Sequence, residues 1–152
     1  MYLVLVRHAK AEDREKWNAK DDLRRPLVKK GVKQAKNIAK YLKKYSIDAI
    51  ISSLAIRASD TAKYIAAYQK QSTFFLSPSL NPEIGIEGYI KHKEEIQQDW
   101  EVVVIVGHEP LIGEFVRHLC GEVSLKISKG CVVELEYKAN KWRLVGLKNF
   151  KA

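Results

Sequence analysis

The chain contains few of the residues that cross-link or interrupt a protein. Cysteine occurs only twice, as Cys120 and Cys131, and neither belongs to a Cys-x-x-Cys pair. A disulfide framework is therefore excluded, and we expect two free thiols. With four prolines and eight glycines in 152 residues, the sequence shows no linker, low-complexity tract or internal repeat. We therefore expect a single domain over residues 1–152.

Long hydrophobic runs are also absent. A membrane-spanning helix needs roughly 18 consecutive apolar residues, and no segment approaches that length. The opening apolar run, residues 2–6, has no basic region before it and is shorter than the core of a signal peptide. It is typical of a first β-strand, so we expect a cytoplasmic protein without membrane contact.

Acidic residues are scarce relative to basic ones. The chain has 18 Asp and Glu against 27 Lys and Arg, a formal net charge of +9. Residues 10–44 alone hold thirteen basic and five acidic residues, a local balance of +8. This segment either attracts anionic partners, such as phosphates, acidic proteins or nucleic acid, or is a solvated lysine-rich helix face without a partner.

Apolar runs of strand length alternate with helical patterns along the chain. The strand-like runs are residues 2–6, 48–52, 73–76 and 102–106. Apolar positions three or four residues apart predict helices over 31–45, 56–68, 88–98 and 110–119, and residues 132–147 predict a closing hairpin. This alternation predicts an α/β fold of three layers, α/β/α, with a mainly parallel central sheet and an antiparallel edge.

Basic and imidazole side chains follow three of the predicted strands. Arg7 and His8 come directly after the first strand, Arg57 follows the second, and His108 follows the fourth. Ligands of open α/β folds bind beyond the carboxyl ends of the strands. The three segments are about fifty residues apart, so we expect these four side chains to meet around one anion-sized hole.

Two arginines and two histidines suit the transfer of a phosphoryl group. The negative charge of that group spreads over three oxygens, and the planar fork of an arginine matches two of them. A neutral imidazole has a free lone pair and can attack phosphorus, while a second histidine holds another oxygen. These side chains supply the positive charge that Mg²⁺ supplies elsewhere, and no carboxylate cluster suits a hard metal. We therefore expect neither a metal nor another cofactor.

With these motifs the sequence resembles the histidine phosphatase superfamily, and in particular its short SixA-type phosphohistidine phosphatases. The superfamily's Arg-His-Gly appears as Arg7-His8-Ala9, and its second-arginine segment as residues 53–62 around Arg57. Its Gly-His-x-Pro contains His108 here. The SixA-type Asp-x-x-Arg-Pro-Leu-Thr-x-x-Gly is matched over residues 22–31, with Asp21 and Asp22 both candidates for the acidic position.

The resemblance implies a phosphoglycerate mutase-like fold and assigns roles to the shared residues. His8 is implied as the nucleophile and His108 as the second catalytic residue, with Arg7 and Arg57 binding phosphate and Arg25 a possible residue at the mouth. Three positions depart from the pattern. Ala9 replaces glycine, so this backbone position needs no positive φ; Val28 removes a helix cap worth about 1 kcal/mol; and Leu54 replaces proline.

A general acid is the least defined part of the implied mechanism. Broad-specificity members place a Glu in the loop before the fourth strand, where it protonates an alkoxide leaving group. Glu83 and Glu87 are the candidates here, and neither is clearly in register. Pro82 takes the place of the acid, as in SixA-type proteins, and an imidazole leaving group needs no strong acid. Glu83 is therefore either a catalytic acid or a solvated loop carboxylate.

Three functions follow from these residues. The first is a phosphatase that hydrolyses phosphohistidine on a protein through a phospho-His8 intermediate, and the short chain favours it. The second is a phosphatase of a small ester, such as a sugar phosphate or nucleotide. The third is a non-catalytic module that binds nucleic acid or protein. Because the lysines are not interleaved with aromatic residues, we do not expect a nucleic-acid partner, and we expect a monomer.

Overall fold

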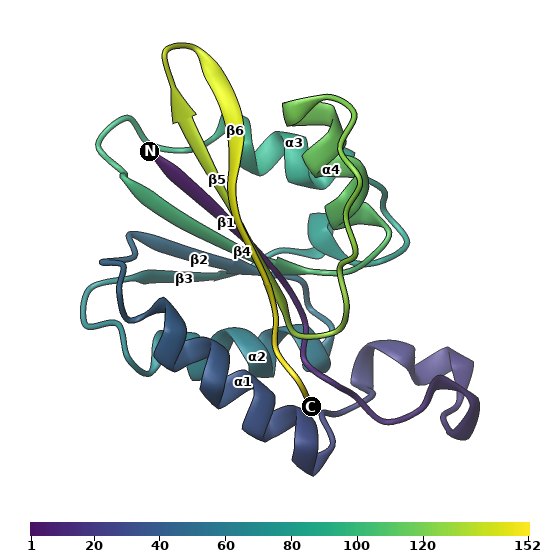
Figure 1. Ribbon diagram of the computed structural model, residues 1–152. Helices are drawn as coiled ribbons and strands as arrows, with labels where there is room; N and C mark the ends of the chain where they lie inside the picture. The colour runs from purple at the N-terminus through teal and green to yellow at the C-terminus, as the bar shows by residue number, and fades with distance from the viewer.

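The computed structural model describes residues 1–152 and contains a six-stranded mixed sheet between two pairs of helices (Figure 1). The strands are β1 (Tyr2–Arg7), β2 (Ala49–Ser52), β3 (Thr73–Leu76), β4 (Val102–Gly107), β5 (Cys131–Lys138) and β6 (Lys141–Asn149). The α-helices are α1 (Lys29–Leu42), α2 (Ile56–Ala66), α3 (Glu87–Glu94) and α4 (Leu111–Cys120). Short 3₁₀ helices occur as η1 (Arg14–Lys16), η2 (Ala19–Arg24) and η3 (Pro78–Leu80).

The strand order is β3-β2-β4-β1-β5-β6. β1, β2, β3 and β4 run parallel, whereas β5 and β6 are antiparallel to their neighbours. The predicted antiparallel edge is thus confirmed. β4 lies in the middle, and all six of its residues are buried, which explains its continuous run of β-branched residues. The hairpin turns through Ala139 and Asn140, both with positive φ, as a two-residue turn requires.

Helices cover both faces of the sheet, so the predicted three layers are confirmed (Figure 1). α1 and α2 pack on one face around a core that includes Val4, Ile38, Ile65 and Val104. α3 and α4 pack on the other face around a core that includes Leu3, Leu5, Tyr89, Ile105 and Phe115. Since successive strand residues point to opposite faces, β1 and β4 contribute alternately to the two cores.

The ends of β1, β2 and β4 lie in register at one edge of the sheet. Arg7 pairs with Gly107, and the His8 N–H donates to the Gly107 carbonyl at 3.1 Å. On the other side of β4, the Ser53 N–H donates to the Val106 carbonyl at 3.2 Å. Neighbouring strands are about 4.8 Å apart, so the residues that follow these three strands stand side by side.

The segment between β1 and α1 extends away from the sheet (Figure 1). It contains η1 and η2, which the sequence pattern did not predict because single 3₁₀ turns are too short to show a helical period. An antiparallel bridge between Ala11 and Leu27 closes the base of this excursion. As Val28 predicts, no side chain caps the start of α1.

None of the helices has the length and apolar character needed to cross a bilayer. Both cysteines are free, as predicted.

A buried carboxylate joins β5 to α1. The two oxygens of Glu134 accept hydrogen bonds from the Tyr41 hydroxyl, at 2.6 Å, and from the Tyr45 hydroxyl. The Lys44 ammonium lies 2.8 Å from the same carboxylate. Burial alone raises the pKa of Glu134, but these hydrogen bonds outweigh it and hold the pKa below its usual value. The charged form of Glu134 therefore stabilises the fold.

Glu134→Gln is expected to lower the free energy of unfolding by about 2 kcal/mol at pH 7, because it replaces one of the two acceptor oxygens by an amide donor and removes the charge that pairs with Lys44. The folded-state pKa lies below the unfolded value of about 4.3, so this stabilisation is present above that pH and is lost as the pH falls through the folded-state pKa. Urea unfolding at pH 7 and at pH 4 measures both effects. The control is Glu136→Gln, on the same strand as Glu134. It breaks a more exposed ion pair with Arg143 of β6 and is expected to cost less than about 1 kcal/mol.

Candidate active site

His8 lies just beyond the end of β1 and is only 5% exposed. Its Nδ1 is 2.8 Å from the carbonyl oxygen of Ala9. Because a carbonyl only accepts hydrogen bonds, Nδ1 carries the ring proton. In the neutral ring, Nε2 therefore keeps its lone pair. Ala9 has no positive φ, as predicted, and is fully buried.

His108 follows β4 and is 2% exposed. Its Nε2 lies 2.8 Å from the hydroxyl oxygen of Ser53, which also accepts the Ala55 N–H at 3.0 Å. Its backbone N–H donates to the Tyr89 hydroxyl at 3.1 Å. Gly107 leaves room for that hydroxyl, since a Cβ there would lie 2.0 Å from it. Ser53 and Tyr89 together fix the position of His108.

The two imidazoles face each other across the edge of the sheet. Their ring centroids are 5.3 Å apart, and the rings are inclined at 54°. Burial lowers the pKa of His8 well below its usual value, and the neighbouring His108 lowers it further. Burial, followed by the positive charge of Arg57, lowers the pKa of His108 to about 3. Both rings are therefore neutral at pH 7.

Arg57 lies in the first turn of α2 and is 1% exposed. Its Nη2 donates to the Asp22 carboxylate at 3.1 Å, and its Nη1 donates to the Asp22 carbonyl at 2.9 Å. Arg25, also buried, lies 3.2 Å from the other carboxylate oxygen. Burial raises the pKa of Asp22, but the charges of Arg57 and Arg25 outweigh it and hold the pKa below its usual value. Of the two candidate aspartates, Asp22 thus bridges both arginines.

Arg7 stands at the end of β1, with its Nη1 donating to the Ile127 carbonyl at 2.9 Å. The Nε–H groups of Arg7 and Arg57 are the two buried side-chain polar groups that have no hydrogen-bond partner. The positive charges of these two arginines also contribute to the lowered pKa of both imidazoles. Unpaired, charged donors beside two neutral imidazoles suit an anion with several oxygens.

Two supporting residues have no role that the sequence pattern predicts. The Thr61 hydroxyl donates to the Arg57 carbonyl at 2.7 Å and accepts the Ala9 N–H at 3.1 Å, which ties α2 to the His8 segment. The Asn81 side chain accepts the Leu54 N–H at 2.9 Å and holds the loop after β2. Thr61 belongs to the second-arginine motif, so the motif marks its position, whereas no sequence signal marks Asn81.

The structure brings Arg7, His8, Arg57 and His108 together and adds Arg25 through Asp22. Glu83, by contrast, is exposed, and none of the hydrogen bonds or ion pairs of the chain involves its carboxylate. Glu87 is exposed as well. No group of three or more histidine, cysteine, aspartate or glutamate side chains is placed to hold a metal ion.

A three-layer fold with paired histidines and arginines at the carboxyl edge of its sheet is the architecture of a class of enzymes that bind and transfer phosphoryl groups. The family model of the histidine phosphatase superfamily (branch 1) matches residues 3–84, and the chain belongs to this superfamily. A comparison with curated protein sequences finds no match.

Solved structures share the fold over nearly the whole chain. The protein histidine phosphatase SixA complexed with tungstate has a TM-score of 0.85 at 21% identity, over 98% of this chain and 97% of that one. The alpha-ribazole phosphatase from Shigella flexneri has a TM-score of 0.79 at 17% identity, over 100% and 96%. A mycobacterial glucosyl-3-phosphoglycerate phosphatase has a TM-score of 0.78 at 16% identity, over 99% and 99%. At these identities the likeness establishes the fold, which is phosphoglycerate mutase-like as predicted.

Proposed function

We propose that the chain is a phosphatase that accepts its substrate's phosphoryl group on His8 and acts as a single domain, without a metal or other cofactor. The observation that carries this proposal is the hydrogen bond between His8 Nδ1–H and the Ala9 carbonyl. It leaves the Nε2 lone pair available in a buried, positively charged setting. The burial that lowers the pKa of His8 keeps this lone pair unprotonated at neutral pH.

The reaction has two steps. In the first, His8 Nε2 attacks phosphorus in line, a new N–P bond forms, and the bond from phosphorus to the leaving group breaks with its electron pair going to that group. The unpaired Nε–H groups of Arg7 and Arg57 support binding of the phosphoryl oxygens, and we assign the binding of another oxygen to His108, whose ring lies 5.3 Å from that of His8. In the second step, water attacks phospho-His8, releases inorganic phosphate and restores the neutral imidazole.

Phosphohistidine on a protein is the substrate that we propose. A protonated phosphohistidine leaves as imidazole and needs no strong general acid, and Glu83 has no contact that would position it as one. The similarity to SixA supports the same substrate. A small phosphate ester is the alternative, because the alpha-ribazole phosphatase and the glucosyl-3-phosphoglycerate phosphatase also share this fold over nearly the whole chain.

A substrate panel separates the two. Purified protein is assayed with a phosphohistidine peptide, sugar phosphates and an aryl phosphate. The substrates carry a radioactive phosphoryl group, and the radioactivity bound to the protein is tested for the acid lability of phosphohistidine. We expect the phosphohistidine peptide to have a kcat/KM at least about tenfold above the esters. Faster turnover of the sugar phosphates would assign the chain to small esters, and no phosphate release from any substrate would contradict the proposal.

Glu83→Gln probes the same choice from the enzyme's side. A carboxylic acid that protonates an alkoxide contributes about 10²–10⁴-fold to the rate, whereas an exposed loop carboxylate contributes nothing to phosphohistidine turnover. We expect Glu83→Gln to change phosphohistidine hydrolysis by less than about twofold, and we expect the same of Glu87→Gln, which tests the second candidate. A loss of a hundredfold or more with Glu83→Gln on the peptide would establish Glu83 as the general acid.

A further inference from the structure

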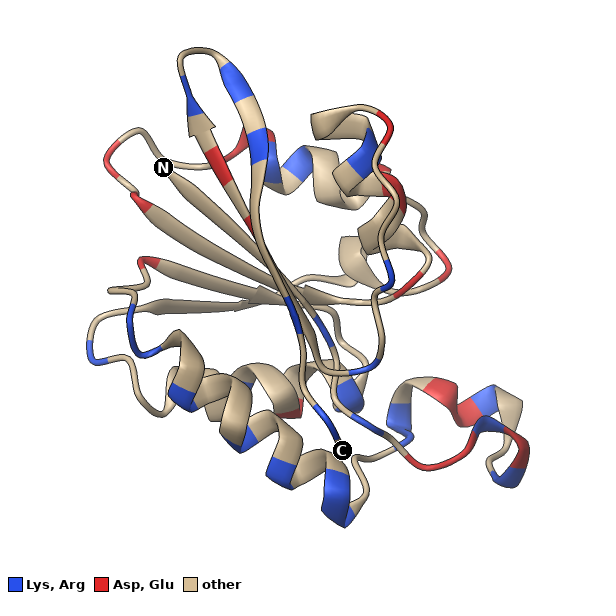
Figure 2. Cartoon of the chain, viewed as in Figure 1, with Lys and Arg blue, Asp and Glu red and all other residues tan.

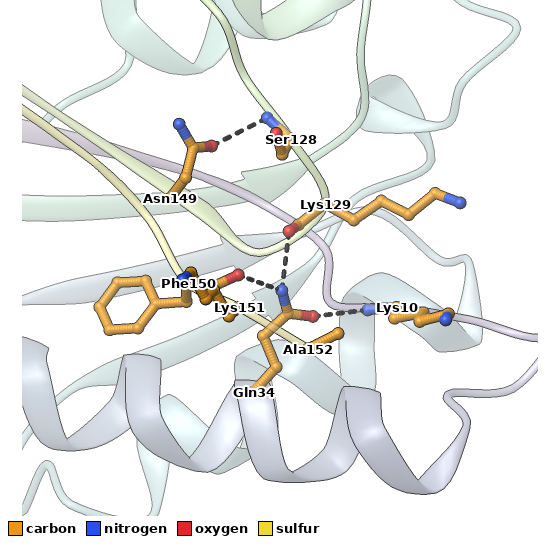
Figure 3. Close-up of a pocket in the computed structure, with 8 residues that line it drawn as sticks. All are labelled: Lys10, Gln34, Ser128, Lys129, Asn149, Phe150, Lys151 and Ala152. Atoms are coloured by element: carbon orange, nitrogen blue, oxygen red, sulfur yellow. Dashed lines mark hydrogen bonds between the residues drawn. The ribbon is translucent and has the colours of Figure 1, made fainter.

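A hollow of about 450 Å³ lies beside the His8 segment, between the start of α1 and the end of β6 (Figure 3). Three of the side chains around it are lysines, Lys10, Lys129 and Lys151, and none of the side chains that line it is acidic. In Figure 3 the backbone atoms of Lys10 and Lys129 lie next to the buried amide of Gln34.

Gln34 fixes the wall of the hollow. Its side-chain oxygen accepts the Lys10 N–H at 2.9 Å, and its amide nitrogen donates to the carbonyls of Lys129, at 2.8 Å, and Phe150, at 2.6 Å (Figure 3). Directly after Lys129, the Gly130 N–H donates to the His8 carbonyl at 2.9 Å. The wall of the hollow is therefore hydrogen-bonded to the backbone of His8.

The basic charge of the hollow continues along α1 (Figure 2). The Lys10 carbonyl accepts the Val28 N–H at 3.1 Å, so the start of α1 adjoins Lys10. The first turns of α1 present exposed lysines and no acidic residue. We call the lysines of the hollow and of these turns the basic face: Lys10, Lys29, Lys30, Lys33, Lys129 and Lys151.

None of the lysines of the basic face forms an ion pair, although the chain has six ion pairs elsewhere. Burial, followed by the charges of Arg7 and Arg25, lowers the pKa of Lys129. An unpaired ammonium group held near other cations is stabilised by an external anion. Six unpaired lysines exceed the one or two further anionic groups of a small ester, but they match a protein surface with several carboxylates.

We propose that the basic face docks an acidic surface of a phosphorylated protein, so that the phosphohistidine of that protein enters the site at His8. This inference rests on the proposed function and adds the surface by which the phosphatase selects its protein substrate. Docking through complementary charge accelerates association, and salt weakens it.

The test uses two synthetic peptides of equal length with a central phosphohistidine, one flanked by Asp and Glu and the other by Asn and Gln. At low salt we expect kcat/KM for the acidic peptide to be about tenfold higher, and at 0.5 M salt the ratio should approach one. In Lys10→Glu/Lys129→Glu the ratio should fall to one or below. Lys138→Glu/Lys141→Glu, at the β5–β6 turn, makes the same charge change far from His8 and should keep the wild-type ratio. Because a ratio is measured on one preparation, partial unfolding of a variant does not affect it.

Binding of the unphosphorylated peptides, followed by fluorescence anisotropy, separates docking from chemistry. Hydrolysis of both peptides at equal rates would overturn the docking proposal and leave the phosphatase intact. Selective binding of the acidic peptide without any hydrolysis would overturn the proposed function and leave the docking surface. Tighter binding of a single-stranded oligonucleotide than of the acidic peptide would overturn the proposal and assign the basic face to nucleic acid.

Discussion

His8→Ala is expected to lower kcat/KM by at least about a thousandfold and to abolish acid-labile labelling of the protein, because the proposed mechanism forms the phosphoenzyme intermediate on His8. His108 is the nearest imidazole, but its Nε2 is engaged by Ser53. The remaining histidines lie elsewhere: His92 is bonded to Ser77, and His118 is stacked on Phe115.

The pH dependence gives an independent check on His8. Burial, followed by the neighbouring His108, lowers the pKa of His8 well below its usual value of 6.5, so the imidazole is neutral at pH 7. If His8 is the nucleophile, the loss of activity caused by its protonation is therefore expected well below pH 6.5. The phosphoryl group of the substrate also titrates, so kcat/KM is measured with substrates whose phosphoryl groups have different pKa values. A step near pH 6.5 that is the same for all of them would belong to the enzyme and would contradict a lowered pKa of His8.

His118→Ala is the control for His8→Ala, since it removes an exposed histidine of α4 outside the site. We expect it to retain wild-type turnover and labelling. Rapid-quench labelling with a radioactive phosphoryl donor measures the intermediate directly. If His8→Ala still forms an acid-labile phosphoprotein, another histidine is the nucleophile and the proposed mechanism is wrong.

The elements of the fold and the position of the site follow from local patterns. A fully apolar strand such as β4 is recognisable because both of its faces are buried, and Arg7, His8 and His108 then lie at strand ends where ligands bind. The closing hairpin over residues 132–147 is predictable because two apolar, alternating runs lie close together in the sequence, and β5 and β6 pair there. These features depend only on residues that are close in sequence.

The contacts that fix the side chains could not be predicted in the same way. Ser53 meets His108 only because β2 and β4 pair in one particular register, and the two residues are 55 positions apart. Asp22 reaches Arg57 from an excursion of 3₁₀ turns, which has no periodic signal. Charge pattern alone also left the lysines of residues 10–44 either solvated or partnered. The hollow beside His8 is what favours the second interpretation.

Arg57→Ala is expected to lower kcat/KM by about 10²–10³-fold, since it removes a charged donor from a buried site where phosphoryl charge develops. Arg143→Ala, which removes an exposed arginine of β6 paired with Glu136, is the control and should remain within about twofold of wild type. Steady-state kinetics with the preferred substrate measures both. Activity of Arg57→Ala within tenfold of wild type would show that Arg57 does not hold the phosphoryl group.

Arg57→Lys is expected to be nearly as damaging, although it keeps the charge. Nη1 and Nη2 of Arg57 are committed to the carbonyl and carboxylate of Asp22, while its Nε–H is buried and unpaired. The guanidinium can therefore stay anchored to Asp22 and still offer a donor to the phosphoryl group. A lysine has a single nitrogen on a flexible side chain and cannot bind Asp22 and the phosphoryl group at the same time in a fixed geometry. Recovery of most of the activity in Arg57→Lys would mean that charge, and not the anchored fork, is what this position supplies.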